Sequence, residues 1–105
     1  MTAEEYYQQG NAWRKQGFYE NGVCVPQDER QAHSCYARGE SLGSVKCKMR
    51  LARCKLLGIG TRKAKKQGLA LCRTALEEAM NSEEKEDYGY AAEVALLERT
   101  IAENE

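Results

Sequence analysis

Hydrophobic residues recur three or four positions apart along most of the chain, which is the spacing of one face of an α-helix. The first such stretch covers residues 3–16, where Tyr6, Gly10 and Trp13 share a face and Gly17 follows one turn later. A half-buried strand would instead alternate every second residue. We therefore predict an amphipathic helix at the start of the chain.

Capping residues mark the ends of the first two predicted helices. Thr2 precedes the first helix and Glu5 follows three residues later, which is the arrangement of a capping box. The second helix begins at about residues 27–28 and ends at about Ser41, and Gly43 can supply the left-handed turn after it. The predicted buried face of the second helix consists of Ala32, Cys35, Tyr36 and Gly39.

The segment after Gly43 is compatible with two kinds of secondary structure. Residues 45–51 alternate between apolar and basic side chains, as a half-buried strand does. When the segment is extended to Leu57, a helical period places two apolar stripes on opposite sides, with Lys46, Arg50 and Arg53 between them. The helix accounts for more of the pattern, and two apolar stripes indicate a helix that lies between neighbours.

Two more helices are predicted in the C-terminal part of the chain. The fourth covers residues 65–80, and Asn81 with Ser82 can cap a fifth over residues 83–102, with Gly89 in its middle. The fifth helix has no partner in a pair of its own, so we expect it to cap the stack. Its predicted apolar stripe is Tyr90, Val94, Leu97 and Ile101.

The chain repeats part of its own pattern 36 residues further on, without a gap. Gly22 falls on Gly58, and Gly39 falls on Ala75. A period in this range is typical of helical solenoids, in which each unit covers the apolar face of its neighbour. Such arrays mostly bind other proteins, so the repeat indicates a kind of activity without naming a partner.

These repeated positions carry a family resemblance. The small Gly10, the aromatic Trp13 and the turn at residues 17–19 resemble the first helix of a tetratricopeptide repeat. From Tyr19 onward, the chain is more similar to the Sel-one-like repeat, which has a longer connection between its helices. The matching positions are Tyr19, Gly22, Val25, Asp28, Ala32, Tyr36 and Gly43 in the first unit, and Leu51, Ala52, Gly58, Gly60, Leu71 and Ala75 in the second.

The chain also departs from the Sel-one-like pattern, partly at cysteines. Cys24 stands where glycine is usual, Cys35 replaces tryptophan, and Gly68 replaces the helix alanine. Secreted cysteine-rich relatives pair a cysteine across the two helices of each repeat, but we do not carry those bonds over to this chain. Five cysteines in no tight spacing are unlike the even sets of disulfide scaffolds. We expect reduced, mostly buried thiols.

The resemblance implies a concave groove, lined by the first helix of each repeat, that holds a protein or a peptide. The helical period separately leaves a basic stripe of the third helix uncovered, and the two arguments overlap. The predicted partner-binding residues are Tyr7, Asn11, Arg14, Lys46, Met49, Arg50 and Arg53.

The zero net charge of the chain hides a strong division of charge. Residues 44–76 carry ten basic residues and no acidic one, whereas residues 77–105 carry ten acidic and two basic ones. Three interpretations remain open: the acidic fifth helix pairs with the basic segment, the basic stripe grips an acidic peptide, or the basic segment binds nucleic acid. Zero net charge and the acidic C-terminal region argue against nucleic acid.

The residue pattern favours a non-enzymatic protein. His33 is the single histidine and lies on the polar side of its predicted helix, where a solvated side chain is the ordinary case. Cys47 and Cys54 are seven residues apart and therefore about 10 Å apart along a helix, too far to ligate one zinc ion. No glycine-rich loop leads into a Lys-Ser/Thr phosphate cradle. We predict no catalytic residues, no metal site and no cofactor.

These observations predict an all-α, right-handed stack in a single domain of residues 1–105. Two helix-turn-helix repeats would cover about residues 3–43 and 44–80, and a capping helix about 83–102. We expect a module that binds a protein or peptide with an acidic element in a concave basic groove. The alternative is a nucleic-acid-binding or regulatory protein that uses the basic segment of residues 46–73, and two repeats also leave self-association possible.

The sequence also bears on where the protein acts. No apolar run approaches the ~20 residues that a bilayer span needs, so we expect no membrane partner. The acidic start, residues 1–5, lacks the apolar stretch of a secretory signal. We therefore expect the protein to work in the cytoplasm.

Overall fold

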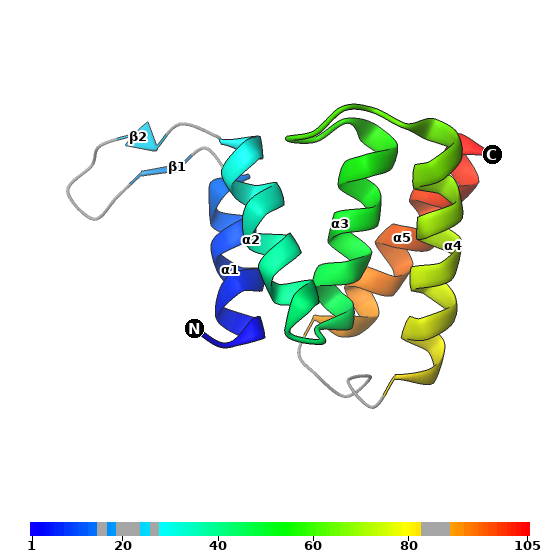
Figure 1. Cartoon of the computed structure of the whole chain (residues 1–105), viewed down its shortest axis with the longest axis horizontal. Helices are drawn as coiled ribbons and strands as arrows, with labels where there is room; N and C mark the ends of the chain where they lie inside the picture. Colours follow the sequence, from blue (N-terminus) through cyan, green and yellow to red (C-terminus); the bar gives the residue numbers. More distant parts are fainter. Residues whose placement is uncertain (15–16, 19–23, 26–27, 83–88) are drawn as a thin grey trace.

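Helices dominate the described part of the chain, as the hydrophobic pattern predicts. The computed structural model describes residues 1–14, 17–18, 24–25, 28–82 and 89–105. Within this part the fold is all-α, apart from a pair of two-residue antiparallel strands that extends from one end (Figure 1). The elements are α1 (Ala3–Trp13), β1 (Gly17–Phe18), β2 (Cys24–Val25), α2 (Glu29–Ser41), α3 (Val45–Leu57), α4 (Lys65–Asn81) and α5 (Tyr90–Asn104).

Capping residues mark the ends of α1 and α3, whereas Asn81 and Ser82, predicted to cap the fifth helix, end α4 instead. The amide N–H of Glu5 donates to Oγ1 of Thr2 at 3.2 Å, and the amide N–H of Thr2 donates to Oε1 of Glu5 at 3.0 Å. This reciprocal pair confirms the predicted capping box of α1. Ser44 caps α3, and α3 ends at Gly58, whose φ of 75° lies in the left-handed region that glycine tolerates. Local sequence therefore sets the limits of these helices.

The segment that could have been a strand is the central helix of the molecule. Figure 1 shows α3 between the α1–α2 pair and α4. One side of α3 contributes Met49, Ala52 and Leu56 to an apolar cluster with α4 and α5. Its other side contributes Cys47 and Cys54 to a second cluster with α1 and α2. The prediction of a helix with two opposed apolar stripes is confirmed.

Very close packing joins α3 to α4. Gly68 is buried in α4, and a Cβ atom added to it would lie only 2.4 Å from Cα of Leu56. Glycine therefore allows the backbones of the two helices to approach more closely than any side chain would permit. Between the helices lie small side chains of α4, such as Cys72 and Ala75, which are fully buried.

The fifth helix starts later than predicted. Gly89 has φ 79° and precedes α5, so the prediction that it lies in the middle of this helix is wrong. Residues 83–88, where the predicted helix begins, lie outside the described residues. The predicted stripe is otherwise correct, because Tyr90, Leu97 and Ile101 are buried in the cluster shared with α3 and α4.

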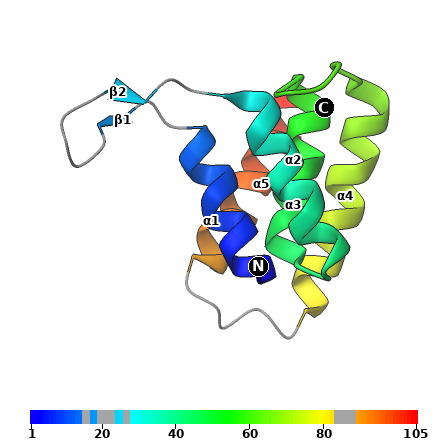
Figure 2. The same cartoon turned by 60° about the vertical axis from the view of Figure 1, so that its left-hand side comes forward.

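Helix α5 lies where the sequence predicts an open groove. Helix α5 packs against both α3 and α4. It passes behind α3 in the view of Figure 1, and Figure 2 shows it between α1 and α3. An acidic helix thus lies along the side of α3 that the sequence predicts to be open. In the described part of the chain, no helix is long and apolar enough to cross a membrane.

Candidate functional site

Four of the predicted partner-binding residues, Tyr7, Lys46, Met49 and Arg53, are buried inside the fold. Tyr7 is 9% exposed, Met49 is fully buried, and Lys46 is 2% exposed. Nζ of Lys46 lies 2.7 Å from Oε2 of Glu4 and 4.6 Å from the centre of the Tyr7 ring. The prediction that the basic stripe of α3 is uncovered is therefore wrong at Lys46, because α1 packs over this end of α3 and supplies the carboxylate. It is also wrong at Arg53, which is 9% exposed and donates to Thr100 of α5.

Helix α5 covers the next part of the stripe with a buried carboxylate. Glu93 is 4% exposed, and its Oε1 accepts hydrogen bonds from Nε of Arg50 at 2.8 Å and from the hydroxyl of Tyr7. Nη2 of Arg50 lies 2.5 Å from the same oxygen. The prediction that acidic α5 pairs with the basic segment thus holds at this point. One oxygen atom fastens α5 to both α1 and α3.

A second side-chain hydrogen bond lies beside this contact and involves α2. The hydroxyl of Tyr36 donates to Oδ1 of Asn11 at 2.5 Å. Burial, followed by the hydrogen bond to Glu93, raises the pKa of Tyr7 to about 12. The tyrosine hydroxyl therefore stays protonated and donates to Glu93 over the whole physiological range. The ring of Tyr36 lies 6.4 Å from that of Tyr7 between centroids, so side chains of four helices meet at this network.

Next to this network is an open pocket lined with arginine. It has a volume of about 370 Å³ and lies where α1, α3 and α5 meet. We call it the arginine pocket, and its lining residues are Asn11, Arg14, Arg50, Arg53 and Leu96. Asn11, Arg14, Arg50 and Arg53 all belong to the predicted partner-binding set, so the structure brings this part of the prediction together.

Unpartnered donors make the arginine pocket electrostatically unusual. Arg53 is 9% exposed; its Nε donates to Oγ1 of Thr100 at 3.0 Å, while its Nη1 is buried without a hydrogen-bond partner among the described residues. Nε of Arg14 is buried and unpartnered in the same sense. Burial lowers the pKa of Arg53, and the charges of Arg50 and Arg14 lower it further. The pocket therefore gathers positive charge that the described side chains do not balance.

Leu96 is the one lining residue that the sequence does not predict. It lies on α5, next to Leu97 of the predicted apolar stripe, and its side chain is half-buried. Only the fold brings α5 against the arginines of α3. The only sequence signal near Leu96 is that Leu97, the next residue, belongs to the predicted apolar stripe. That signal does not indicate that Leu96 lines a pocket.

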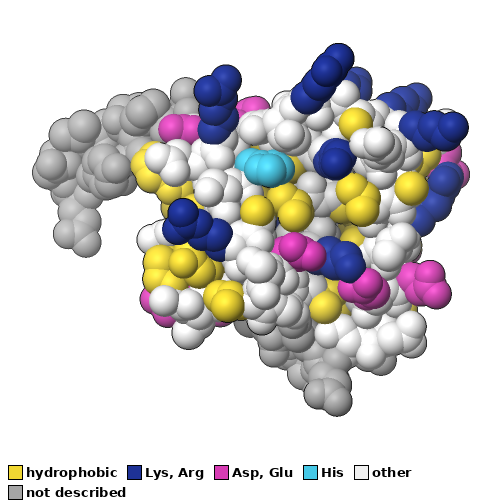
Figure 3. All heavy atoms as spheres, in the orientation of Figure 1, with side chains coloured by type: hydrophobic (Ala, Val, Ile, Leu, Met, Phe, Trp, Pro, Cys, Tyr) yellow, Lys and Arg dark blue, Asp and Glu magenta, His cyan; other side chains and the backbone are white. Residues whose placement is uncertain are grey.

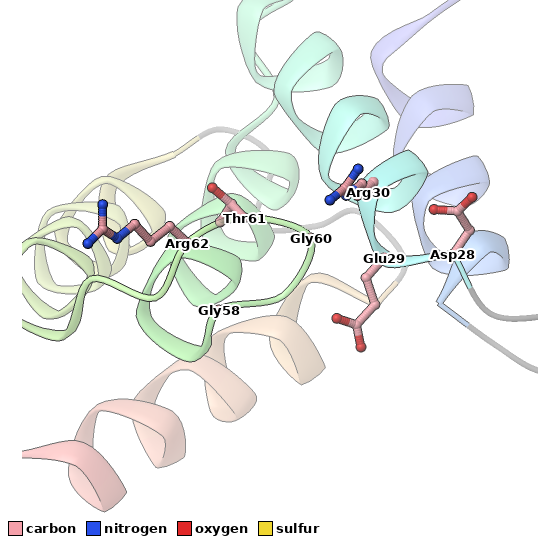
Figure 4. Close-up of a pocket in the computed structure, with 7 residues that line it drawn as sticks. All are labelled: Asp28, Glu29, Arg30, Gly58, Gly60, Thr61 and Arg62. Atoms are coloured by element: carbon pink, nitrogen blue, oxygen red, sulfur yellow. The ribbon is translucent and has the colours of Figure 1, made fainter.

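A larger open hollow lies near the N-terminus of α2 and the loop between α3 and α4. Its volume is about 500 Å³, and its lining includes Asp28, Glu29, Arg30 and Arg62. Figure 4 shows that the carboxylates of Asp28 and Glu29 point in different directions and that Arg62 extends away from both. Asp28 is already engaged, since its Oδ1 accepts from the amide of Gln31 at 3.1 Å. These side chains do not converge on a common point.

A third hollow of about 270 Å³ is mostly apolar and lies among α2, α3 and α4. Figure 3 shows this side of the molecule, with hydrophobic side chains among basic ones. Leu71, which is 40% exposed, lies beside His33 and Lys55 in this hollow. Burial, followed by the charge of Lys55, lowers the pKa of His33. The hollow offers apolar contact but no set of unpartnered polar groups.

The other predicted cations of the basic segment lie at the surface. Arg62, Lys63, Lys65 and Lys66 are exposed in the loop before α4 and in its first turn. The amide groups at the start of α4 have no side-chain cap. Among the described residues, no group of three or more His, Cys, Asp or Glu side chains is placed to hold a metal ion.

Comparison of the chain with protein families, with curated proteins and with solved structures finds no match. The function must therefore be argued from the site itself.

Proposed function

We propose that this protein is a non-enzymatic binding module that recognises an acidic group of a protein or peptide partner in the arginine pocket. One observation carries the proposal: three guanidinium groups line an open pocket, and a single buried carboxylate, Glu93, binds one of them. Arginine is always charged in proteins, and its planar fork matches acidic groups. A partner that supplies an anion would bring negative charge to Arg14 and Arg53.

The proposed site is narrower than the groove that the sequence predicts. Lys46 and Met49 are buried against other elements, so they contribute to packing in this conformation. What stays open is the end of the groove near the C-terminus of α1. A partner would enter there with a single acidic side chain or terminus and would not lie along the whole of α3.

We also propose that the two helical pairs are repeats of the Sel-one-like or tetratricopeptide-like kind. The 36-residue period supports this view, because it relates α2 to α4. Ala32 and Gly39 of α2 fall on Gly68 and Ala75 of α4, and all four are buried. One position differs, since Cys35 is buried whereas the equivalent Leu71 is 40% exposed. Helix α5 would then be the capping element.

A reducing compartment such as the cytoplasm suits the cysteines. Cys35, Cys54 and Cys72 are buried free thiols, and Cys47 is fully buried as well. Burial raises the pKa of Cys72 to about 11, which keeps the thiol protonated and unreactive at neutral pH. These thiols behave as small apolar side chains of the core, and we propose that the protein works where thiols stay reduced.

Peptide arrays test the proposed function directly. An array of random peptides with and without a fixed acidic residue would be probed with the intact protein, with Arg14→Gln and with Arg99→Gln. Arg99 is a matched control because it is 73% exposed on α5, outside the arginine pocket. We expect capture to require the acidic residue, to fall about tenfold or more in Arg14→Gln, and to persist in Arg99→Gln. Capture without regard to acidic residues would overturn the proposal.

Nucleic acid is a second candidate because of the exposed cations before and in the first turn of α4. Within the described part of the chain, Arg62, Lys63, Lys65 and Lys66 make no ion pair. Phosphate contacts of this kind weaken steeply as salt rises. A titration of the protein with a single-stranded oligonucleotide at increasing salt tests this candidate, and Lys63→Gln with Lys66→Gln should abolish any binding that uses the loop.

A further inference from the structure

The charges around the arginine pocket do not balance. Arg14, Arg50 and Arg53 line it, and Glu93 is the carboxylate that binds one of them. A carboxylate of a partner would bring one negative charge, which leaves one guanidinium group without a partner. A phosphate monoester brings between one and a half and about two negative charges near neutral pH. The charge balance therefore favours a phosphorylated ligand over an aspartate or glutamate side chain.

The positions of the donors also favour a tetrahedral anion. Arg14 lies at the C-terminal end of α1, whereas Arg50 and Arg53 lie one turn apart on α3. Arg50 uses Nε and Nη2 on Glu93, which leaves Nη1 as a third donor from a third side chain. A carboxylate has two oxygens in one plane, which a single guanidinium fork satisfies. A phosphate group has three terminal oxygens, enough to accept from all three arginines that line the pocket.

Burial makes the vacant donors costly for the protein alone. Nη1 of Arg53 and Nε of Arg14 are inaccessible to water and have no partner among the described residues. Arg53 cannot turn away easily, because its Nε is held by Thr100 of α5 at 3.0 Å. Each guanidinium group carries five N–H bonds, so a ligand oxygen in the open pocket would bind the N–H groups that face it and not these two enclosed atoms. The fold therefore holds three guanidinium groups in place around the pocket, and such preorganised positive charge favours anion binding.

The remaining lining fits the atoms that carry a phosphate on a peptide. Leu96 offers a half-buried apolar surface from α5. A pocket of about 370 Å³ is wider than a carboxylate requires and open to solvent. The ester carbon of a phosphorylated side chain can lie against Leu96 while the phosphoryl oxygens reach the arginines.

We propose that the arginine pocket binds a phosphorylated serine or threonine of a partner peptide. This inference rests on the proposed function, since it specifies the acidic group that the partner supplies. Clusters of arginine are a recurrent means of reading phosphorylated motifs. Phosphorylation of the partner would then switch the interaction on, because the unmodified hydroxyl brings no charge to Arg14 or Arg53.

The test compares three short peptides that differ only at their central residue: phosphoserine, glutamate or serine between alanine flanks. Each is titrated into the full chain and followed by NMR, with inorganic phosphate and a single-stranded oligonucleotide as further probes. We expect the phosphoserine peptide to bind about tenfold or more tightly than the glutamate peptide, and the serine peptide not to bind. Shifts should centre on Arg14, Arg53 and Leu96.

The pH dependence sharpens this comparison. The second pKa of a phosphate monoester is about 6, so lowering the pH from about 7.5 to about 5.5 should reduce the affinity for the phosphoserine peptide several-fold. The glutamate side chain has a pKa of about 4.3, so the affinity for the glutamate peptide should change little over the same range. A phosphoserine affinity that is constant over this range would contradict recognition of the dianion.

Variants separate the pocket from general attraction to a cationic protein. Arg14→Gln should reduce the affinity for the phosphoserine peptide about tenfold or more. Arg14→Lys keeps the positive charge but loses the planar guanidinium group, so its affinity should lie between those of Arg14→Gln and the intact protein. Arg99→Gln should bind like the intact protein. Arg14 is the preferred position because it ends α1 and is only half-buried, and circular dichroism of each variant verifies folding.

The outcomes distinguish the two proposals. Equal affinity for glutamate and phosphoserine peptides would overturn the phosphate inference and leave the acidic-partner function standing. If neither peptide binds, both are overturned. Inorganic phosphate or an oligonucleotide that binds through Arg14 more tightly than the phosphoserine peptide would replace the peptide as the ligand, and would also overturn the inference.

Discussion

The α3–α4 interface and the junction of α1, α3 and α5 are both built on α3, but they use different chemistry. At the first, Gly68 of α4 lies against Leu56, and the side chains between the helices are small and apolar. At the second, Arg50 and Arg53 of α3 bind Glu93 and Thr100 of α5.

The difference between the two regions is what each leaves unsatisfied. The apolar interface closes without an unpartnered buried side-chain N or O atom in the described chain, whereas the polar junction leaves three: Nε of Arg14, Nη1 of Arg53 and Oε2 of Glu93. Packing of apolar atoms is complete once the surfaces meet. Charged groups in a buried junction need further partners, which is why the proposed binding site lies at the junction and not at the apolar interface.

The largest expected effect comes from breaking the polar junction at Glu93. Glu93→Ala leaves the guanidinium of Arg50 and the hydroxyl of Tyr7 without their shared acceptor. Removing one partner of a buried ion pair typically costs about 3–5 kcal/mol. Urea denaturation of the variant should show that loss in the free energy of unfolding. Glu93→Gln, which keeps an acceptor, should lose less, and an unchanged stability in both would contradict the importance of the junction.

A smaller loss is expected from Tyr7→Phe. The substitution keeps the ring beneath Lys46 but removes the hydroxyl that donates to Glu93. A hydrogen bond to a charged group contributes about 1.5–3 kcal/mol. The same denaturation measurement should detect the change at neutral pH, and a Tyr6→Phe variant on the same helix serves as the control.

Alkaline pH gives Tyr7→Phe a second, distinctive signature. The pKa of Tyr7 is raised to about 12 in the folded protein, against about 10 in an unfolded chain. The folded state therefore holds the proton to higher pH, so this contribution is complete below about pH 10 and is lost as the pH rises from about 10 to 12. We expect the stability of Tyr7→Phe to decline less steeply over that window. A parallel decline in both proteins would argue against the buried hydroxyl.

The apolar interface should respond to a single added methyl group. In Gly68→Ala the new Cβ would lie 2.4 Å from Cα of Leu56, and a backbone atom cannot rotate away. Overpacking costs about 1–3 kcal/mol, which exceeds the gain of about 1 kcal/mol from better helix propensity. Thermal and urea denaturation should show a net loss. Gln67→Ala, at the exposed neighbouring position, controls for propensity, and a Gly68→Ala protein of greater stability would disprove the close approach.

The smallest effect is expected at a surface ion pair between the same helices. Nζ of Lys48 lies 2.6 Å from Oε1 of Glu78, and the two side chains are 28% and 46% exposed. Exposed pairs contribute about 0–1 kcal/mol. Lys48→Ala should therefore shift the free energy of unfolding by no more than that amount. A loss as large as that of Glu93→Ala would remove the distinction between a buried and an exposed pair.

Much of the fold could be predicted because its determinants are local. The capping box of Thr2 and Glu5 and the left-handed glycine at Gly58 mark helix limits within a few residues of themselves. The two apolar stripes of α3 identified it as an inner helix. The predicted start of α5 is wrong because a glycine can either lie inside a helix, which it destabilises, or adopt a left-handed conformation before one. Gly89 adopts the left-handed conformation before α5.

The candidate site was predictable only in part because it depends on distant contacts. The helical period placed Arg50 and Arg53 together on one face of α3, and motif position added Asn11 and Arg14. Nothing local indicates that Glu93 would return to cover Arg50, or that Leu96 would line the pocket. The prediction that Lys46 is uncovered is wrong for the same reason. Glu4 of α1 forms an ion pair with Lys46, and the sequence pattern does not show that these two helices meet there.

The hydrogen bond from Tyr7 to Glu93 spans 86 positions of the chain, which has a consequence for synthesis. The α1–α2 and α3–α4 hairpins consist of neighbouring segments and can form while the ribosome is still adding residues. The hydrogen bond between the first and last helices can form only after α5 has emerged from the ribosome. We therefore expect nascent chains that stop short of α5 to acquire helices early but to have no ligand pocket.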